Sequence, residues 1–502
     1  MNYRILFKFL GIFLAATGAT MVPCWMWAIY FGEWRVLLDF IGSTVVSFLM
    51  GLVLFLAGRK ADNRFYQREA LGLVALGWIV APVVGALPFW WTGVLGPVDA
   101  YFESVSGYTT TGASVFTAEI FESCPKSLMF WRSFTHWLGG IGIILLFIAV
   151  LPYLGAGGKQ MLRSEQSSID PQALRPRVRD TALSLLKVYL SLTVLQTLAL
   201  MVAGMSFFDA LCHAFGALAT GGYSTRPASV ADYHSPLIEF VLIVCMISGA
   251  TDFALYAAAI KGRWQDFRRD SQWHVYLGIL AVATLLVTMD LLGTGTAIDL
   301  PSKLDIHEER AYYQEQPLQA LRHAAFAVVS IGTTTGFGTE DFDQWPYLSR
   351  TILVVLMIMG GCAGSTAGGL KILRVVILAK MLYWRLESTF RPKTVRAIRI
   401  RGDIIDHPAQ MAVYGYFALY TTWFAFSLLV LSGIGLPFDS AFSAVAACLN
   451  GVGPGLELVG PAMNYAFLPA IGKLFLCLCM IMGRLELITV MVLAMPSFWR
   501  PR

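Results

Sequence analysis

The sequence is poor in charged residues, and this scarcity indicates the class of protein. Asp, Glu, Lys and Arg make up 14% of its 502 residues, whereas soluble globular proteins contain about 25% charged residues. Hydrophobic residues account for 57% of the chain, and the mean hydropathy is +0.64. The composition therefore indicates a polytopic membrane protein and excludes a soluble enzyme, a nucleic-acid-binding protein and a disordered regulator.

The sequence also lacks motifs for catalysis, metal binding and nucleotide binding. Its eight cysteines lie mostly in apolar stretches and show no spacing typical of a metal site or a disulfide framework. There is no Gly-Lys-Ser/Thr motif for phosphate binding, and no cluster of carboxylates or Ser–His set for catalysis. We therefore expect a protein that is not an enzyme and has no covalently bound cofactor, so any nucleotide regulation would come from a partner.

Long apolar runs predict ten membrane spans, because a helix needs about 20 apolar residues to cross about 30 Å of hydrocarbon. The runs are residues 5–30, 36–57, 70–91, 130–151, 181–204, 236–260, 273–293, 350–383, 411–435 and 469–495. Arg4 and Lys8 at the start of the first run could belong to a signal peptide. The run continues to Tyr30 without a clear cleavage site, so we interpret it as a retained helix.

The basic residues predict the orientation of these spans. With the N-terminus in the cytoplasm, most of the 37 Lys and Arg residues fall in cytoplasmic tails and linkers, above all in residues 152–180 and 384–409. Both termini are then cytoplasmic. The basic linkers could dock a soluble regulator or contact anionic membrane lipid. An outer stretch with Glu340, Asp341 and Asp343 could concentrate cations, or could be an ordinary solvated loop.

Four shorter segments between the spans form an internal repeat. Residues 102–114 and 326–338 share Phe, Val-Ser and Thr-Thr-Thr-Gly at the same positions without a gap. Residues 209–222 and 439–452 each place a glycine twelve residues after an aspartate. The resulting glycines recur at near-equal intervals, which indicates a fourfold repeat of span, half-helix, glycine turn and span; they are Gly112, Gly221, Gly336 and Gly451.

The predicted fold is an all-α polytopic membrane protein with four pseudo-symmetric span–pore-loop–span units around one pore. An extra helix pair precedes these units. The predicted divisions are residues 1–66 for the helix pair and 67–180, 181–271, 272–409 and 410–502 for the four pore units. Three aspartates are predicted to cap the outer ends of half-helices: Asp99, Asp209 and Asp439.

The four glycine turns could bind a cation. Non-helical backbone at membrane depth persists only where protein buries it or where it lines a wet path. A half-helix that enters from outside points its partially negative C-terminal end at the membrane middle, and four turns can aim carbonyl oxygens at one axis. Thr111, Thr220, Thr335 and Asn450 precede the glycines and could add oxygens. Ordinary helix breaks are the alternative, which four breaks on one side disfavour.

The run at 350–383 contains a glycine-rich interruption below the predicted turns. Because each glycine costs a helix about 1 kcal/mol relative to alanine, we predict two half-helices joined by a loop, and close helix packing through small residues is the alternative. The loop residues are Gly360, Gly361, Gly364, Ser365, Thr366, Gly368 and Gly369. Arg484, inside the last run, could form a barrier to cations beside this loop, or could pair with Glu486 or Glu457.

The fourfold pattern of half-helices and glycine turns resembles the Trk/Ktr/HKT superfamily of potassium transporters over about residues 67–495. The N-terminal helix pair and the chain length resemble the bacterial Trk branch, the membrane subunit of the Trk system. The resemblance implies potassium uptake across the bacterial inner membrane and a homodimer with one pore per chain. It also implies a cytoplasmic nucleotide-binding regulatory subunit of the RCK type.

By position, the resemblance places the potassium-binding selectivity filter at Thr111-Gly112, Thr220-Gly221, Thr335-Gly336 and Asn450-Gly451. It further implies that the loop at residues 360–369 obstructs the pore. We expect this loop and Arg484 to form the gate. The fourth filter segment has Asn-Gly instead of Thr-Gly, so its oxygen geometry is expected to differ. Potassium is expected as the transported substrate and not as a cofactor.

Channel-like conduction is the predicted transport mechanism. The alternative is an alternating-access secondary transporter that couples potassium entry to protons or sodium. Such transporters also contain broken helices, usually as one or two pairs. A proton relay would need a chain of intramembrane carboxylates, whereas the apolar runs contain only scattered ones, such as Asp252.

Overall fold

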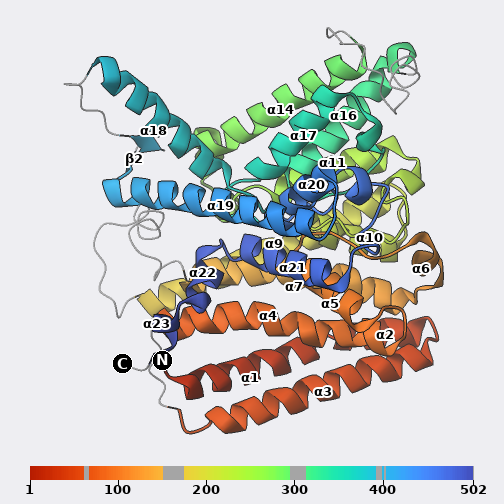
Figure 1. The fold of residues 1–502 in the computed structure, drawn as a ribbon. Helices are drawn as coiled ribbons and strands as arrows, with labels where there is room; N and C mark the ends of the chain where they lie inside the picture. Colours follow the sequence, from red (N-terminus) through yellow and green to blue (C-terminus); the bar gives the residue numbers. More distant parts are fainter. Residues whose placement is uncertain (62–66, 151–173, 294–312, 392–397, 401–402, 501–502) are drawn as a thin grey trace.

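The computed structural model describes the chain except residues 62–66, 151–173, 294–312, 392–397, 401–402 and 501–502 (Figure 1). Most long helices run side by side, close to horizontal in Figure 1, and both termini lie at the left. The Tyr3 hydroxyl donates to the Trp499 carbonyl at 2.7 Å, so the two ends of the chain are in contact. The predicted basic linker 152–180 falls largely outside the described residues.

The first three helices form the predicted N-terminal pair of spans, Tyr3–Tyr30 and Trp34–Gly58, and the pair lies at the lower edge of Figure 1. They are α1 (Tyr3–Ala19), α2 (Val22–Tyr30) and α3 (Trp34–Gly58). Glycines bring the backbones of α1 and α3 together, since a Cβ on Gly11 would lie 2.5 Å from the Gly51 carbonyl oxygen. Small residues of this kind allow close helix packing inside a membrane. The Ser47 hydroxyl adds a hydrogen bond of 2.6 Å to the Leu14 carbonyl.

Each of four half-helices lies between two other helices along the chain, as the repeat predicts. The half-helices are α5 (Pro97–Tyr108), α10 (Phe207–Leu218), α16 (Pro317–Gly332) and α20 (Phe438–Asn450). The helices before them are α4 (Gln67–Trp91), α9 (Leu174–Val202), α14 (Ser271–Leu291) and α19 (His407–Gly433). Those after them begin with α7 (Lys126–Val150), α11 (Pro236–Gly249), α17 (Tyr347–Met359) and α21 (Ala470–Arg484).

The half-helices connect the four units in a cycle. Each half-helix packs between the two helices that flank it in the chain and also against a helix of the preceding unit. These inter-unit pairs are α10 with α7, α16 with α11, α20 with α17, and α5 with α21. The last pair closes the cycle from the fourth unit to the first, so the units surround one axis.

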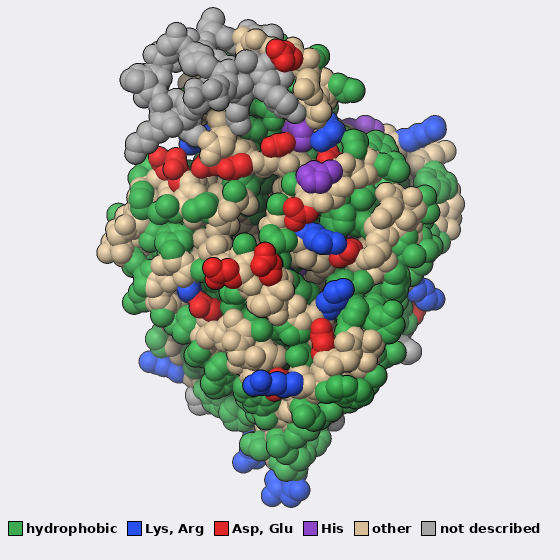
Figure 2. All heavy atoms as spheres, turned by 90° about the vertical axis from the view of Figure 1, so that its right-hand side faces the viewer, with side chains coloured by type: hydrophobic (Ala, Val, Ile, Leu, Met, Phe, Trp, Pro, Cys, Tyr) green, Lys and Arg blue, Asp and Glu red, His purple; other side chains and the backbone are tan. Residues whose placement is uncertain are grey.

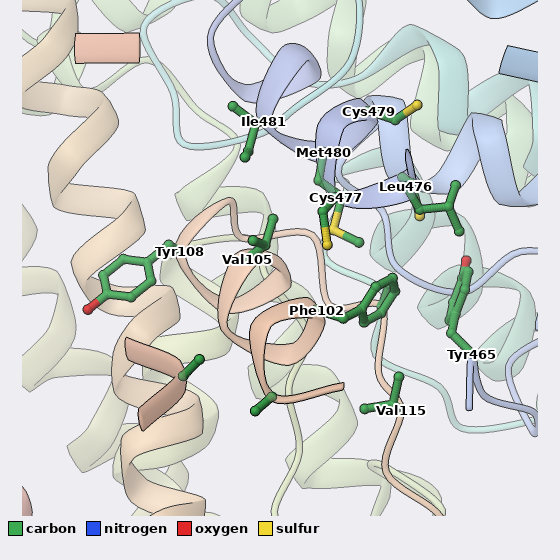
Figure 3. Close-up of a cluster of buried hydrophobic side chains, with 14 of the residues drawn as sticks. Phe102, Val105, Tyr108, Val115, Tyr465, Leu476, Cys477, Cys479, Met480 and Ile481 are labelled. Carbon is green, nitrogen blue, oxygen red and sulfur yellow. The ribbon is translucent and has the colours of Figure 1, made fainter. Parts of the chain in front are cut away.

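Apolar side chains fill the contact that closes the cycle. Figure 3 shows Phe102 and Val105 of α5 beside Cys477 and Met480 of α21. The ring of Phe102 also lies 5.6 Å from that of Tyr465, centroid to centroid. All eight cysteines are free and seven of them are buried, which agrees with a packing role.

Span prediction was right for most runs and wrong in detail for two. The helices Tyr3–Tyr30, Trp34–Gly58, Arg68–Trp91, Asp180–Val202, Ser271–Leu291 and His407–Gly433 are long and apolar enough to cross a membrane. The run at 236–260 instead forms α11 and α12 (Phe253–Ile260), bent by 93°, and the run at 469–495 bends by 115° after α21. Each was predicted to be one continuous span.

Local backbone chemistry accounts for both bends. Asp252 is the N-cap of α12 and accepts a hydrogen bond from the Ala254 amide at 2.9 Å, so a new helix begins there. After α21, Glu486 and Leu487 have φ values of 60° and 44°, which end the helix. The chain then continues into α22 (Ile488–Met491) and α23 (Pro496–Trp499).

The predicted interruption of the run at 350–383 is confirmed. Helix α17 ends at Met359, residues 360–371 form a loop, and α18 (Ile372–Phe390) follows. Helix α18 projects away from the bundle at the upper left of Figure 1. It leads to an antiparallel pair of two-residue strands, β1 (Arg399–Ile400) and β2 (Asp403–Ile404). Short helices α6 (Ala118–Ser123) and α13 (Gln265–Arg269) complete the architecture.

The predicted aspartate caps are wrong. The N-cap residues of α5, α10 and α20 are Gly96, Ser206 and Pro437. Ser206 is the one whose side chain accepts a backbone hydrogen bond, from the Asp209 amide. The three aspartates lie instead in the first turn of each helix, where a negative charge still interacts favourably with the helix dipole.

Close packing of α1 on α3 predicts a glycine-specific effect on stability. A Cβ on Gly51 would lie 2.6 Å from the Gly11 carbonyl oxygen. We expect Gly51→Ala to lower the free energy of unfolding by about 1–3 kcal/mol, as for other overpacked sites. Gly415→Ala in α19 is the control, because its Cβ would meet nothing within 4 Å. Thermal unfolding in detergent measures both, and equal losses would contradict this packing.

Candidate functional site

The four half-helices end in turns that share one backbone geometry. In each turn, an amide donates to the carbonyl five residues earlier, at 2.8–2.9 Å. The amides belong to Thr111, Gly221, Thr335 and Val452. The residue before each amide has a left-handed φ between 53° and 68°; these residues are Thr110, Thr220, Thr334 and Gly451. The hydrogen bonds therefore define equivalent positions in the four units.

A glycine follows the shared position in every turn. These glycines are Gly112, Gly222, Gly336 and Gly453, with φ values of 82°, 79°, 87° and 97°. A Cβ on each would collide with a carbonyl oxygen of the next turn: Gly112 with Gly221, Gly222 with Thr335, Gly336 with Val452, and Gly453 with Thr111. The contacts run in chain order and close on the first turn. The carbonyls of Thr111, Gly221, Thr335 and Val452 thus lie in one closed ring, which we call the carbonyl ring.

The structure corrects the predicted alignment of the second and fourth turns. Thr111, Gly112, Thr335 and Gly336 occupy the expected positions, but Gly222 and Gly453 are the equivalents of Gly112 in the other two turns. Gly221 contributes a carbonyl, and Thr220 and Gly451 lie at the left-handed position. The predicted Gly221 therefore lies one residue before the ring glycine of its turn, and the predicted Gly451 lies two residues before.

Asn450 does not take the place expected for a filter oxygen. Its side-chain amide donates to the Tyr420 hydroxyl at 2.9 Å and to the Ala446 carbonyl at 2.8 Å. Each ring glycine is followed by an apolar residue and then by Ser or Gly, as in Gly222-Tyr-Ser and Gly453-Pro-Gly. This pattern favours Gly222 in the second turn, but it does not distinguish Gly453 in the fourth, because Gly451-Val-Gly fits it as well.

A buried ion pair supports the first two turns, and the sequence reasoning missed it. Arg132 on α7 binds Glu103 on α5, with Nε and Oε1 2.6 Å apart and exposed side-chain fractions of 2% and 0%. Glu103 also accepts from the Val115 amide at 2.9 Å. Arg132 donates to the Ser224 carbonyl and to the Ser114 hydroxyl, each at 3.0 Å. An arginine inside an apolar run was the available signal.

His136 explains why residue 221 is a glycine. The φ of Gly221 is not left-handed, but a Cβ there would collide with the His136 imidazole. The same imidazole stacks on the ring of Tyr223, with centroids 4.0 Å apart and an interplanar angle of 15°. Gly221 is therefore required by a neighbouring side chain, whereas Gly222 is required by its φ and by a backbone contact.

The loop at residues 360–371 lies against the half-helix ends of three units. Thr366 donates its hydroxyl to the Leu218 carbonyl at 2.8 Å, at the end of α10. The Gly368 amide donates to the Thr334 hydroxyl at 2.7 Å. A Cβ on Gly368 would collide with the Asn450 carbonyl oxygen. The loop is thus packed directly beside the carbonyl ring.

Arg484 reaches this loop from the end of α21. Its side chain is buried and donates to the Thr366 carbonyl at 2.6 Å and to the Gly139 carbonyl at 3.2 Å. The alternative pairing with a glutamate is wrong, because Glu486 binds Arg374 at 2.5 Å and Glu457 lies 3.6 Å from Arg350. Arg484 therefore links the loop to α7 through carbonyl oxygens.

Acidic side chains surround a hollow on the face where the half-helices begin (Figure 2). Glu340 is 3.5 Å from His323, and its side chain is 44% exposed. Partial burial raises the pKa of the Glu340 carboxyl above its ordinary value, and the Arg322 guanidinium opposes this shift. Among the described residues, no three His, Cys, Asp or Glu side chains form a group that could hold a metal ion. The carbonyl ring supplies backbone oxygens as candidate cation ligands.

The two glycines of the second turn should respond differently to alanine. We expect Gly221→Ala to cost about 1–3 kcal/mol of stability through overpacking, and His136→Ala to restore part of this loss in a double variant. Gly222→Ala should not be restored by His136→Ala, because its Cβ collides with the Thr335 carbonyl. Thermal unfolding of the single and double variants measures this. A tolerated Gly222→Ala would show that Gly222 is not a ring glycine.

Comparison with known proteins agrees with this architecture. The model of the TrkH family, described as cation transport protein, matches residues 39–500. The chain is 35% identical to the Trk system potassium uptake protein TrkH of Halomonas elongata and 33% identical to that of Escherichia coli, over all of each chain. It is 30% identical to the Trk system potassium uptake protein TrkG of Escherichia coli, over 99% of each chain.

A solved structure shows the same fold. The crystal structure of the potassium transporter TrkH from Vibrio parahaemolyticus matches with a TM-score of 0.87 and 32% sequence identity, and the match covers all of both chains. The resemblance drawn from the glycine turns is thereby confirmed. This chain belongs to the TrkH family of cation transport proteins.

Proposed function

We propose that this protein takes up potassium across the bacterial inner membrane through a channel-like pore. The closed carbonyl ring is the observation that carries the proposal, since backbone oxygens from four turns can replace the water shell of a cation. The relatives named as potassium uptake proteins support potassium as the substrate. The proposal includes the division into pore units at residues 67–180, 181–271, 272–409 and 410–502.

Electrostatics favour cation entry along this path. The half-helices direct their partially negative C-terminal ends at the carbonyl ring. Exposed acidic groups, among them Glu340 and Glu457, would raise the local cation concentration. An inside-negative potential of 100 mV then supplies about 2.3 kcal/mol for each monovalent cation. No chemical energy source is needed for uptake in this scheme.

Alternating access is the second candidate function, and the bends in α11–α12 and after α21 are the observation that favours it. Current and flux measurements on the purified protein in vesicles separate the two. Channel-like conduction predicts a reversal potential that follows the potassium gradient alone. A reversal potential that moves with the proton or sodium gradient would support coupled transport and contradict the proposal.

The loop and Arg484 form the gate in this proposal. The loop residues Gly360–Gly369 lie beside the ring, and a glycine-rich segment can adopt two backbone arrangements of similar energy. The hydrogen bond from Arg484 to the Thr366 carbonyl stabilises the arrangement seen here. The positive charge of Arg484 also opposes cation passage.

The proposed partners are a second copy of the chain and a cytoplasmic regulator. We propose cytoplasmic termini, a homodimer and a cytoplasmic nucleotide-binding regulatory subunit of the RCK type. Helix α18 supports a docking role, because it projects from the bundle, bears Lys380 and Arg385, and has Arg391 as its C-cap residue. Anionic membrane lipid is the alternative contact for this basic surface.

Ion selectivity should depend on Gly336 more than on a nearby glycine. A side chain at φ +87° costs about 1–3 kcal/mol, and a Cβ there would also collide with the Val452 carbonyl. We expect Gly336→Ser to lower the potassium-to-sodium permeability ratio by about tenfold, equivalent to about 1.4 kcal/mol. Gly338→Ser is the matched control, because its Cβ would meet only Glu340, at 3.9 Å. Unchanged selectivity in Gly336→Ser would remove this turn from the filter.

Potassium flux without a partner tests the gate. We expect Arg484→Ala to raise flux, because the Thr366 carbonyl loses its hydrogen bond and the positive charge leaves the path. A variant that lacks residues 363–367 should do the same, and the double variant should add little. Expression and oligomeric state serve as controls. Lower flux in a well-expressed Arg484→Ala would mean that Arg484 supports the open pore, and the obstruction would then lie in the loop alone.

A further inference from the structure

We propose that Arg132 is a positioning residue for ion selectivity, because it fixes the first filter turn relative to the second. The inference rests on the proposed function of the carbonyl ring. Arg132 lies on α7, outside the four turns, and it contacts no ring carbonyl. It acts through the residues that follow the ring glycines.

The contacts of Arg132 fall at equivalent places in two units. Ser114 lies two residues after Gly112, and Ser224 lies two residues after Gly222. Arg132 donates to the hydroxyl of the first and to the carbonyl of the second, each at 3.0 Å. One guanidinium thus holds both strands that leave the ring, and its planar fork fixes their separation more strictly than a single ammonium could.

Glu103 completes the connection from inside the first half-helix. Its carboxylate accepts from Arg132 at 2.6 Å, from the Ser114 hydroxyl at 3.0 Å and from the Val115 amide at 2.9 Å. Buried charge-assisted hydrogen bonds of this kind are short and directional. The first turn is therefore fixed to α5 on one side and, through Arg132, to the second unit on the other.

Tyr223, directly after Gly222, is enclosed by the same group. Its ring centroid is 3.6 Å from the Arg132 guanidinium carbon and 4.0 Å from the His136 ring centroid. Two groups this close to one centroid cannot share a face, so the tyrosine ring lies between them. Its hydroxyl donates to the Glu103 carbonyl at 2.9 Å. The carbonyl of Gly221 is thus two residues from a side chain that is held on both faces and at its tip.

The third and fourth turns have different support. Hydroxyl groups of the same unit bind them: Ser330 donates to the Phe337 carbonyl at 2.7 Å, and Tyr465 donates to the Gly453 carbonyl at 2.8 Å. Arg350 does link these two units, but it contacts Asp343 and Glu457, farther from the ring glycines, and the Glu457 side chain is 47% exposed. Arg350 is therefore a matched control for Arg132.

Arg132→Lys separates the geometry of the guanidinium from its charge. Lysine keeps the positive charge opposite Glu103, which avoids a buried unpaired carboxylate, but it cannot span the same three acceptors. We expect the potassium-to-sodium permeability ratio of the full-length protein in vesicles to fall by about tenfold, with rubidium discrimination reduced as well. The thermal unfolding temperature should stay near that of the wild type, so the change would not reflect general unfolding.

Arg350→Lys should leave the permeability ratios unchanged. If Arg132→Lys does not fold, Ser114→Ala removes one contact of Arg132 and leaves the ion pair intact, and a several-fold loss of selectivity is expected from it. Wild-type permeability ratios in a folded Arg132→Lys would overturn this inference and leave the proposed function standing. Equal losses of selectivity in Arg132→Lys and Arg350→Lys would do the same. A wild-type protein without preference for potassium would overturn the proposed function, and this inference with it.

Discussion

Close backbone contacts join the four turns around one axis, and the rest of the structure depends on them. Each ring glycine lies so close to a carbonyl of the next turn that no side chain fits. Such a contact requires four chain segments to end at the same depth. The half-helices satisfy this requirement, because each packs against a helix of the preceding unit. The position of each turn therefore depends on the unit before it. The ring carbonyls accept no hydrogen bond within a helix. Inside a membrane an unpaired carbonyl is costly unless an ion or a water molecule binds it.

The pseudo-symmetry of the repeat breaks on one side of the ring. Helix α7 continues without interruption from Lys126 to Val150, whereas the corresponding helices of the other three units bend or stop. Beside those breaks, the loop at residues 360–371 contacts the ends of α10 and α20 and Thr334, just after α16. Arg484 and Glu486 lie at the last break, where one reaches the loop and the other binds Arg374 of α18. A movement of α18 would therefore act on both the loop and Arg484, and this is the physical route by which the proposed cytoplasmic partner would reach the proposed gate.

Ion pairs occur in this protein both within one unit and between units, and they differ in burial. The Arg132–Glu103 pair lies beside the first two turns and has almost no exposed surface. The contacts of Arg350 and Arg322 lie farther out, with partners that include the half-exposed Glu457 and the buried Glu239. A buried pair gives little net stability, but it defines one arrangement of the groups around it. The first two turns are thus held by ionic geometry and the other two by hydroxyl groups.

The sequence by itself determined the class of protein, the fourfold repeat, the interrupted run at residues 350–383 and the family, because these follow from hydropathy, spacing and glycine content. It did not settle the register of the second and fourth turns, because Gly221-Gly222 and Gly451-Val-Gly453 each offer two glycines, and contact with the next unit decides between them. The bends after Gly249 and Arg484 were also missed, since an apolar run conceals a capped break. The hydrogen-bond partners of Arg132 and Arg484 lie 18 to 345 residues away in the chain. Only the tertiary structure decided them, because a buried charge takes its partner from whichever segment packs beside it.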